Sequence, residues 1–185
     1  MHLPTFLKSF LPVSACAAAL FLTLTPETEA TTPAGGAPLA VQMVGTATGI
    51  ARNIDLPTGA VDATCFEVDL VDLASGQVIG TGVDCLVDPQ MNQGGLTLTD
   101  YTVFKFPDGT LVAKAEVDVR EATLGQQGVT HLTGSFPDPA GNDIIFGTGA
   151  YVGATGQVRL SGGVDMSKFG AGEIGFNCLF VIDLD

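Results

Sequence analysis

Tryptophan is absent from this chain, and residues of positive charge are few. The 185 residues include 7 Lys or Arg against 20 Asp or Glu, which gives a net charge of −13 at pH 7. Such an acidic surface repels phosphate backbones and anionic lipid headgroups, so we expect no nucleic-acid partner. Charged residues make up only 15% of the chain and apolar residues 46%, so the chain can fill a core and is expected to fold.

Histidine is also scarce, which argues against several kinds of catalysis. His2 lies near the N-terminus and His131 stands alone, whereas a catalytic zinc site normally takes three protein ligands. A Ser-His-acid triad would depend on the same His131, and no Gly-x-Ser-x-Gly motif accompanies it. The glycine-rich runs have no helix behind them that could bind phosphate. We therefore expect no metal and no cofactor.

Long apolar runs are missing except near the N-terminus. The run from Phe10 to Leu24 has about 15 apolar-leaning residues, short of the roughly 20 that span a bilayer. Lys8 precedes this run. The segment ends in Thr28-Glu29-Ala30, where small residues occupy the third and first positions before the expected cleavage point. This pattern predicts a secretory signal peptide, residues 1–30, cleaved after Ala30. The alternatives are an uncleaved anchor and a lipoprotein cleavage box before Cys16.

From that signal peptide we expect the protein to be secreted or periplasmic, with no membrane insertion after cleavage. Residues 31–39, TTPAGGAPL, are rich in Thr, Pro, Gly and Ala and are expected to form a flexible leader. The remaining length, residues 40–185, suits one domain.

Long amphipathic helical stretches are absent as well, whereas glycine is abundant, with 24 residues. Short alternating segments punctuated by Gly, Pro, Asn and Asp predict strands instead. The expected strands are 40–53, 63–73, 77–87, 95–106, 109–122, 128–136, 143–164 with a break near Gly153, and 173–184. Eight short antiparallel strands can close on themselves and leave no exposed edge. The sequence therefore predicts an all-β fold, an eight-stranded antiparallel up-and-down β-barrel.

Alternation along two of these segments predicts which side chains are buried. In segment 109–122 one face carries Leu111, Ala113, Ala115, Val117 and Val119. In segment 173–184 one face carries Ile174, Phe176, Cys178, Phe180, Ile182 and Leu184. Leu179 and Val181 make the other face of the last segment apolar too, so it is expected to be covered on both sides.

Three cysteines remain after signal cleavage, namely Cys65, Cys85 and Cys178. A hairpin through Ala74-Ser75-Gly76 that pairs Leu73 with Gln77 puts Val71 opposite Ile79, Asp69 opposite Thr81, Glu67 opposite Val83 and Cys65 opposite Cys85. Opposed Cβ atoms lie about 4.5–5.5 Å apart, close enough for a cross-strand disulfide between Cys65 and Cys85. Cys178 competes for the same partners, because closure of a barrel brings the last strand near the early ones.

Three stretches taken together resemble the allene oxide cyclase and dirigent superfamily of small β-barrels. They are GQVIGTGVDC at 76–85, YTVFKFPDGTL at 101–111 and IIFGTGAYVGATGQV at 144–158. The resemblance runs in unbroken order over roughly residues 65 to 184. It implies an eight-stranded barrel, often trimeric, with a hydrophobic cavity. Enzymes of this superfamily steer the cyclisation of a reactive intermediate, and its dirigent members guide radical coupling without an oxidant of their own.

The resemblance also implies roles for single residues. Cys85 aligns with a cavity cysteine of the plant cyclases, and Asn53 matches the Asn of their Glu-x-Asn strand, whose Glu has no counterpart here. The distinctive glycines are Gly147, Gly149, Gly153 and Gly156. These small residues are expected to let the backbone turn and pack closely, while Tyr151 fills the space that they leave.

Carboxylates are the remaining candidates for chemistry. Glu67 and Asp69 alternate with Phe66, Val68 and Leu70, so both acids point to one side of their strand. At a barrel mouth a raised pKa would let either act as acid or base, together with Cys85 as the third candidate catalytic residue. A solvated outer face is the alternative. Asp100, Tyr101 and Arg120 lie on central strands, where they could hold the polar end of a ligand.

The sequence thus predicts an exported small β-barrel that binds a small hydrophobic molecule and guides its cyclisation or isomerisation without a cofactor. Asn53, Tyr101, Arg120 and Tyr151 are the expected ligand-binding residues. The alternative is a non-catalytic secreted barrel, a carrier or an assembly component, whose interior is filled by side chains. An apolar pocket with a few converging polar groups would favour the first, and a packed interior the second.

Overall fold

The computed structural model describes residues 37–92, 95–121, 129–134 and 142–185. The expected signal peptide, residues 1–30, and most of the expected leader lie outside these ranges. Within them, no helix is long and apolar enough to cross a membrane.

The described part of the chain is built from strands and one short 3-10 helix, η1 (Phe169–Ala171). The first five strands are β1 (Leu39–Thr48), β2 (Ile50–Leu56), β3 (Gly59–Asp72), β4 (Val78–Asn92) and β5 (Gly95–Phe106). The others are β6 (Gly109–Glu121), β7 (Val129–Gly134), β8 (Ile144–Gly149), β9 (Gly156–Asp165) and β10 (Glu173–Leu184). All their pairings are antiparallel. The prediction of an all-β fold with an antiparallel sheet is confirmed.

Two of the eight expected strands are each divided into two, one of them at the break that was expected near Gly153. The segment 40–53 breaks at Gly49, where the backbone N–H donates to the carbonyl oxygen of Gly172 and the chain leaves β10 to pair with β3 as β2. A side chain at Gly49 would collide with Phe66, whose ring lies 2.8 Å from the place of a Cβ. The segment 143–164 turns between β8, which pairs with β6, and β9, which pairs with β7 and β10.

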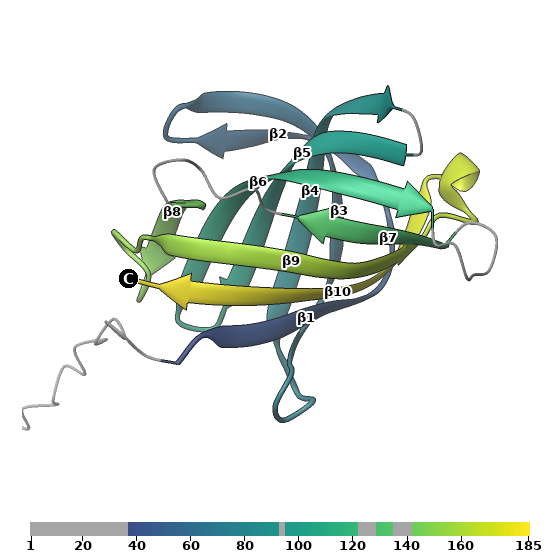
Figure 1. Cartoon of the computed structure of the whole chain (residues 1–185). Helices are drawn as coiled ribbons and strands as arrows, with labels where there is room; N and C mark the ends of the chain where they lie inside the picture. Colours follow the sequence, from purple (N-terminus) through teal and green to yellow (C-terminus); the bar gives the residue numbers. More distant parts are fainter. Residues whose placement is uncertain (1–36, 93–94, 122–128, 135–141) are drawn as a thin grey trace, which may run out of the picture.

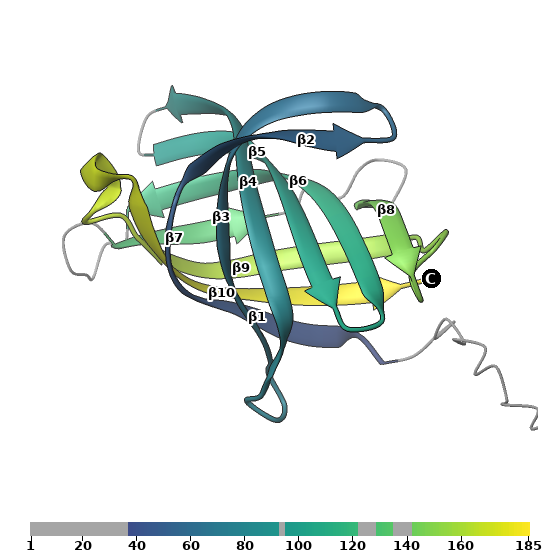
Figure 2. The ribbon, with the colours of Figure 1, turned by 180° about the vertical axis from the view of Figure 1, so that it is seen from behind.

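The strands follow one another across a single sheet in the order β1-β10-β9-β7-β6-β5-β4-β3-β2, with β8 beside β6. β3 has two partners on one side: β2 along its first half and β1 along Asp69–Asp72. In Figures 1 and 2 the strands β1, β10, β9 and β7 run across the molecule, and β3, β4 and β6 run steeply past them. The sheet is strongly curved, so its two parts face each other.

The main core fills the space between these two parts. The ring centres of Phe104 on β5 and Phe180 on β10 lie 5.1 Å apart. Those of Phe66 on β3 and Phe176 on β10 lie 5.6 Å apart. The expected buried faces of β6 and β10 are confirmed, except that Ala115 and Leu184 are half-buried. On the other face of β10, Leu179 and Val181 are half-buried. The expectation that β10 is covered on both sides is thus met in part.

The hairpin of β3 and β4 has the expected register over most of its length. Cys65 lies opposite Cys85, Glu67 opposite Val83 and Asp69 opposite Thr81. The expected pairs of Val71 with Ile79 and of Leu73 with Gln77 are wrong. An irregularity between Leu70 and Val71 brings Val71 opposite Val78, and the backbone N–H of Asp72 donates to the Gln77 carbonyl oxygen. Ile79 is the extra residue. It lies next to the turn, so the rest of the ladder stays in place.

The four motif glycines lie at the turn between β8 and β9. Gly149, Gly153 and Gly156 have φ of 58°, 76° and 144°, which other residues rarely adopt. Gly147 is required for space, because an added Cβ would lie 1.9 Å from the Tyr151 carbonyl oxygen. Tyr151 itself is half-buried and packs on the core, with its ring 5.4 Å from that of Phe106.

Gly147→Ala is expected to lower the free energy of unfolding by about 1–3 kcal/mol, because the backbone of the turn has to move away from the new methyl group. Urea denaturation measures the change. Gly170→Ala is the control, since nothing lies within 4 Å of its Cβ position, and we expect it to change stability by less than about 0.5 kcal/mol. Equal stability of the two variants would contradict the assigned packing.

Candidate functional site

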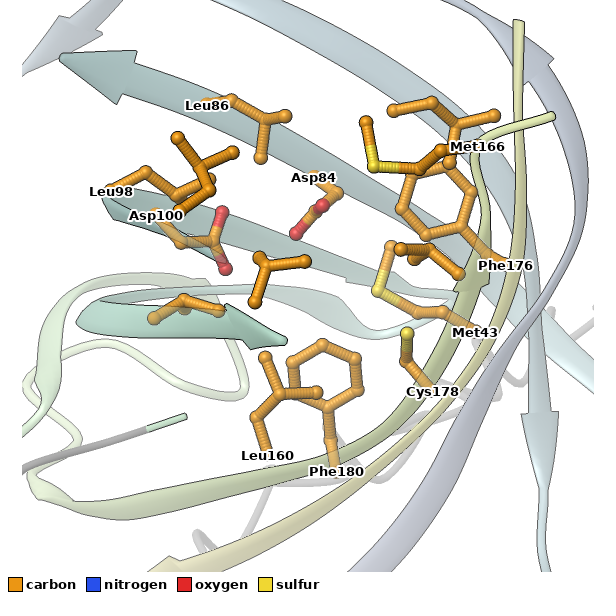
Figure 3. A pocket seen from close by; sticks show the side chains of 15 residues that line it. Met43, Asp84, Leu86, Leu98, Asp100, Leu160, Met166, Phe176, Cys178 and Phe180 are labelled. Atoms are coloured by element: carbon orange, nitrogen blue, oxygen red, sulfur yellow. The ribbon is translucent and has the colours of Figure 1, made fainter. Parts of the chain in front are cut away.

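The core contains one notable pocket, with a volume of about 40 Å³. Its walls are mostly apolar and come from β1, β4, β5, β6, β9 and β10. Examples are Met43, Leu98, Val117, Leu160, Phe176 and Phe180. Figure 3 shows these walls surrounding two carboxyl groups, those of Asp84 and Asp100. The space suits a few waters, and is far below the roughly 150 Å³ of a cavity that holds benzene and the roughly 300 Å³ of a drug-sized site.

Asp84 and Asp100 come from neighbouring strands, β4 and β5. In the ladder Asp84 lies opposite Thr102 and Asp100 opposite Leu86, so the two aspartates are diagonal neighbours on one face of the sheet. Their exposed fractions are 8% and 2%. The Thr102 hydroxyl donates to Asp100 Oδ2 over 2.6 Å. For Asp100 Oδ1 the described residues offer no hydrogen-bond donor, apart from a proton that the pair itself carries.

Burial makes both carboxyls weak acids. Desolvation raises the pKa of Asp84 well above its ordinary value, and the charge of Asp100 raises it further. Desolvation also raises the pKa of Asp100, although hydrogen bonds from Thr102, from Asp84 and from the backbone N–H of Cys85 oppose the rise. No Lys or Arg is among the residues that line the pocket. Two adjacent carboxyls in such surroundings favour a state in which a proton on Asp84 is donated to Asp100.

Cys178 of β10 also lines the pocket and forms no disulfide with the other described cysteines. Burial and the nearby carboxyl of Asp84 raise the pKa of its thiol to about 12. The thiol donates to the carbonyl oxygen of Gly163 over 3.7 Å. At neutral pH Cys178 is therefore a neutral, weakly polar wall of the pocket and a poor nucleophile.

The Cys65–Cys85 disulfide lies on the opposite face of the sheet, with the two Cα atoms 4.0 Å apart. It belongs to a second apolar cluster with Ala63, Val83 and Tyr101, against which Ile54 and Leu56 of β2 pack. Cys85 thus has no free thiol in this structure and does not reach the pocket. The thiol that does so is that of Cys178.

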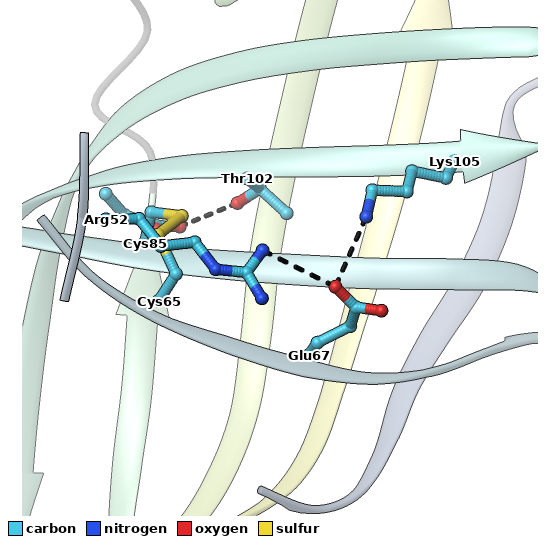
Figure 4. The surroundings of a disulfide bond; sticks show 7 residues. Arg52, Cys65, Glu67, Cys85, Thr102 and Lys105 are labelled. Carbon is cyan, nitrogen blue, oxygen red and sulfur yellow. Dashed lines mark hydrogen bonds and ion pairs between the residues drawn. A yellow bond between two sulfur atoms is a disulfide. The ribbon is translucent and has the colours of Figure 1, made fainter. Parts of the chain in front are cut away.

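Glu67 and Asp69 also lie on the outer face, and both are exposed. Glu67 Oε2 lies 3.6 Å from Arg52 Nη1 and 3.2 Å from Lys105 Nζ, as Figure 4 shows beside the disulfide. Exposed ion pairs of this kind contribute little to stability. Neither acid lines the pocket, so the alternative of a solvated outer face describes their place.

The four expected ligand-binding residues lie away from the pocket as well. Asn53 is exposed and donates to Asp62 Oδ1 over 2.9 Å, and Arg120 pairs with Asp118 at 3.3 Å. Tyr101 is in the outer cluster, with the Lys114 ammonium 5.7 Å from its ring centre. Tyr151 lines a different hollow near the C-terminal end of β10, of about 450 Å³. Burial and contact with Asp108 raise its pKa.

Of the residues that the sequence analysis named as candidates for catalysis or ligand binding, Asp100 alone lines the pocket. Asp84 was missed, although a signal existed. The predicted register puts Cys65 and Cys85 on one face, so Asp84, next to Cys85, has to point to the other. Its neighbours on that face, Gly82 and Leu86, are small or apolar, which marks an acid buried among core positions.

Comparisons with known proteins add no assignment. No protein-family model matches the chain, and no curated protein matches it either. Within the described ranges, no group of three or more His, Cys, Asp or Glu side chains could hold a metal ion.

The stability of the protein is expected to fall as pH rises above about 4, the ordinary value for Asp. The raised pKa values of Asp84 and Asp100 mean that the folded chain holds more protons than the unfolded chain above that pH. The stability that the protonated pair provides is complete below the unfolded pKa and is lost as pH rises through the folded pKa. The slope can reach about 1.4 kcal/mol per pH unit for each proton.

Asp84→Asn should flatten this dependence, because an amide does not ionise. The measurement is urea denaturation at a series of pH values. Asp183→Asn, on the exposed face of β10, is the matched control and should keep the slope of the wild type. A slope that Asp84→Asn leaves unchanged would show that the pair is not protonated in the folded state.

Loss of the disulfide should cost about 3 kcal/mol of unfolding free energy, because the bond closes a loop with a sequence separation of 20. The double variant Cys65→Ser/Cys85→Ser and the reduced wild type should be destabilised equally in urea denaturation. Reductant should have no further effect on the variant. A wild type whose stability does not respond to reductant would contradict the bond.

Proposed function

We propose that this protein is an exported β-barrel that binds a small, largely apolar molecule in its interior and guides a cofactor-free cyclisation or isomerisation. The observation that carries the proposal is the placement of two buried carboxyls in an otherwise apolar pocket. Such walls would hold the substrate in one conformer, while the carboxyls Asp84 and Asp100 would stabilise charge that develops during the reaction. This is the chemistry that the resemblance to allene oxide cyclases and dirigent proteins implies, relocated to other residues.

Closure of the sheet into a barrel is part of the proposal. Its support is the second pairing of β1, which joins β10 through ten residue pairs and β3 through four. With that second ladder the strands β1, β3, β4, β5, β6, β7, β9 and β10 would form a ring of eight. The ring would then have the eight strands that the sequence predicts, and β2 and β8 would lie outside it.

Export is supported by two features of the chain. The N-terminal segment has the pattern of a signal peptide, and the Cys65–Cys85 bond is of a kind that persists in oxidising compartments. The resemblance adds a homotrimer as the expected assembly.

A non-catalytic barrel, a carrier or an assembly component, is the second candidate. The observation in its favour is the small pocket, about 40 Å³, which means that side chains fill most of the interior. This candidate would leave the two carboxyls without a ligand.

Native mass spectrometry of the mature protein from its own host tests the proposal. We expect a trimer that releases a reproducible small apolar ligand when the activation energy is raised. The Cys65→Ser/Cys85→Ser variant, whose change lies outside the pocket, should carry the same ligand if it assembles. A wild type that carries no ligand, and whose pocket takes up none on incubation with small apolar compounds, would favour the non-catalytic barrel.

A further inference from the structure

The polar end of the pocket has a definite hydrogen-bonding character. Asp100 Oδ2 already accepts from Thr102, whereas Asp100 Oδ1 is buried and has no donor among the described residues outside the pair. Asp84 lies beside it on the next strand and lines the same pocket. Within the pair the proton on Asp84 is the donor to Asp100, so a ligand gains where it makes more hydrogen bonds than the one that it displaces.

We infer that Asp84 and Asp100 form a hydrogen-bonding pair that recognises the hydroxyl group of a small uncharged alcohol. A hydroxyl has one donor and two acceptor positions. It can therefore enter between the two carboxyls, donating to Asp100 Oδ1 and accepting from the proton on Asp84, which makes two hydrogen bonds in place of the direct one. The apolar side chains around the pair, such as Leu98, Val117 and Phe180, would hold the hydrocarbon part.

Charged ligands fit this site less well. A carboxylate would bring a further negative charge toward two carboxyls in an apolar cavity. An ammonium group would be favoured only if the pair were ionised, which burial opposes. Its dehydration would also have to be offset in a pocket whose remaining walls are mostly apolar. An uncharged group that both donates and accepts a hydrogen bond avoids both the charge repulsion and the dehydration cost.

This inference rests on the proposed function, because it requires a pocket that opens to a small molecule. It names the class of that molecule. A matched series of five-membered rings separates the two claims: cyclopentane, cyclopentanol, cyclopentylammonium and cyclopentanecarboxylate. Binding is measured at neutral pH from the NMR shifts of pocket methyl groups, those of Leu98, Val117 and Leu160.

Cyclopentanol should bind about fivefold or more tightly than cyclopentane, the effect of about one net hydrogen bond. The double variant Asp84→Leu/Asp100→Leu should bind both rings but lose the preference, while Asp183→Leu on the exposed face of β10 should keep it. If the double variant does not fold, the side-chain carboxyl ¹³C shifts of the wild type give the same information. They should move with cyclopentanol and much less with cyclopentane.

The outcomes distinguish the two failures. Equal binding of cyclopentanol and cyclopentane, or tighter binding of cyclopentylammonium, would overturn the inference and leave the proposed function standing. Failure of all four rings to bind would contradict the proposed function itself.

Discussion

The register of β3 against β4 is the constraint on which the rest of the structure depends. The disulfide between Cys65 and Cys85 fixes these strands at one directly opposed pair. Because side chains alternate along a strand, that pair determines which face every neighbour occupies. The sulfurs lie outside under β2, and Asp84, the residue before Cys85, lies inside. A shift of β4 by one residue would turn Cys85 inward and Asp84 outward, and would part Cys85 from Cys65.

The same alternation explains the chemistry of the interior. Asp100 lies on β5 between Leu98 and Thr102, all three on the inner face. Two acids are thereby brought together where no described cation lines the pocket. Burying the two carboxyls costs less free energy when they hold protons than when both are ionised. The pair therefore offers a hydrogen-bond donor and an acceptor rather than two negative charges. Cys178, which has a raised pKa for the same reason, adds no charge.

Local patterns predicted much of the fold. The alternation in β6 identified its buried face from Leu111 to Val119, and the loop at Ala74-Ser75-Gly76 gave the correct opposition of Cys65 and Cys85. What local patterns could not give was the division at Gly49, because it depends on contact with Phe66, a residue distant in sequence. The irregularity at Val71 likewise has no signal in the hydrophobic pattern.

The candidate site was harder to predict than the fold. Glu67 and Asp69 alternate correctly, but alternation alone does not say which face is the inner one. The apolar partners Phe66, Val68 and Leu70 occupy the inner face, which sends both acids to solvent. Resemblance to a family placed the reactive thiol at Cys85, whereas the disulfide removes that thiol and Cys178 lies in the pocket. Candidate residues could be assigned to the pocket only once the inner and outer faces of the sheet were known.

The protonation of the Asp84–Asp100 pair is the central claim, and the side-chain carboxyl ¹³C shifts in a pH titration test it most directly. The exposed carboxyls of the protein give the reference within the same sample. We expect at least one carboxyl of the pair to keep its proton at a pH where the exposed acids have ionised. Titration of both Asp84 and Asp100 together with the exposed acids would contradict it.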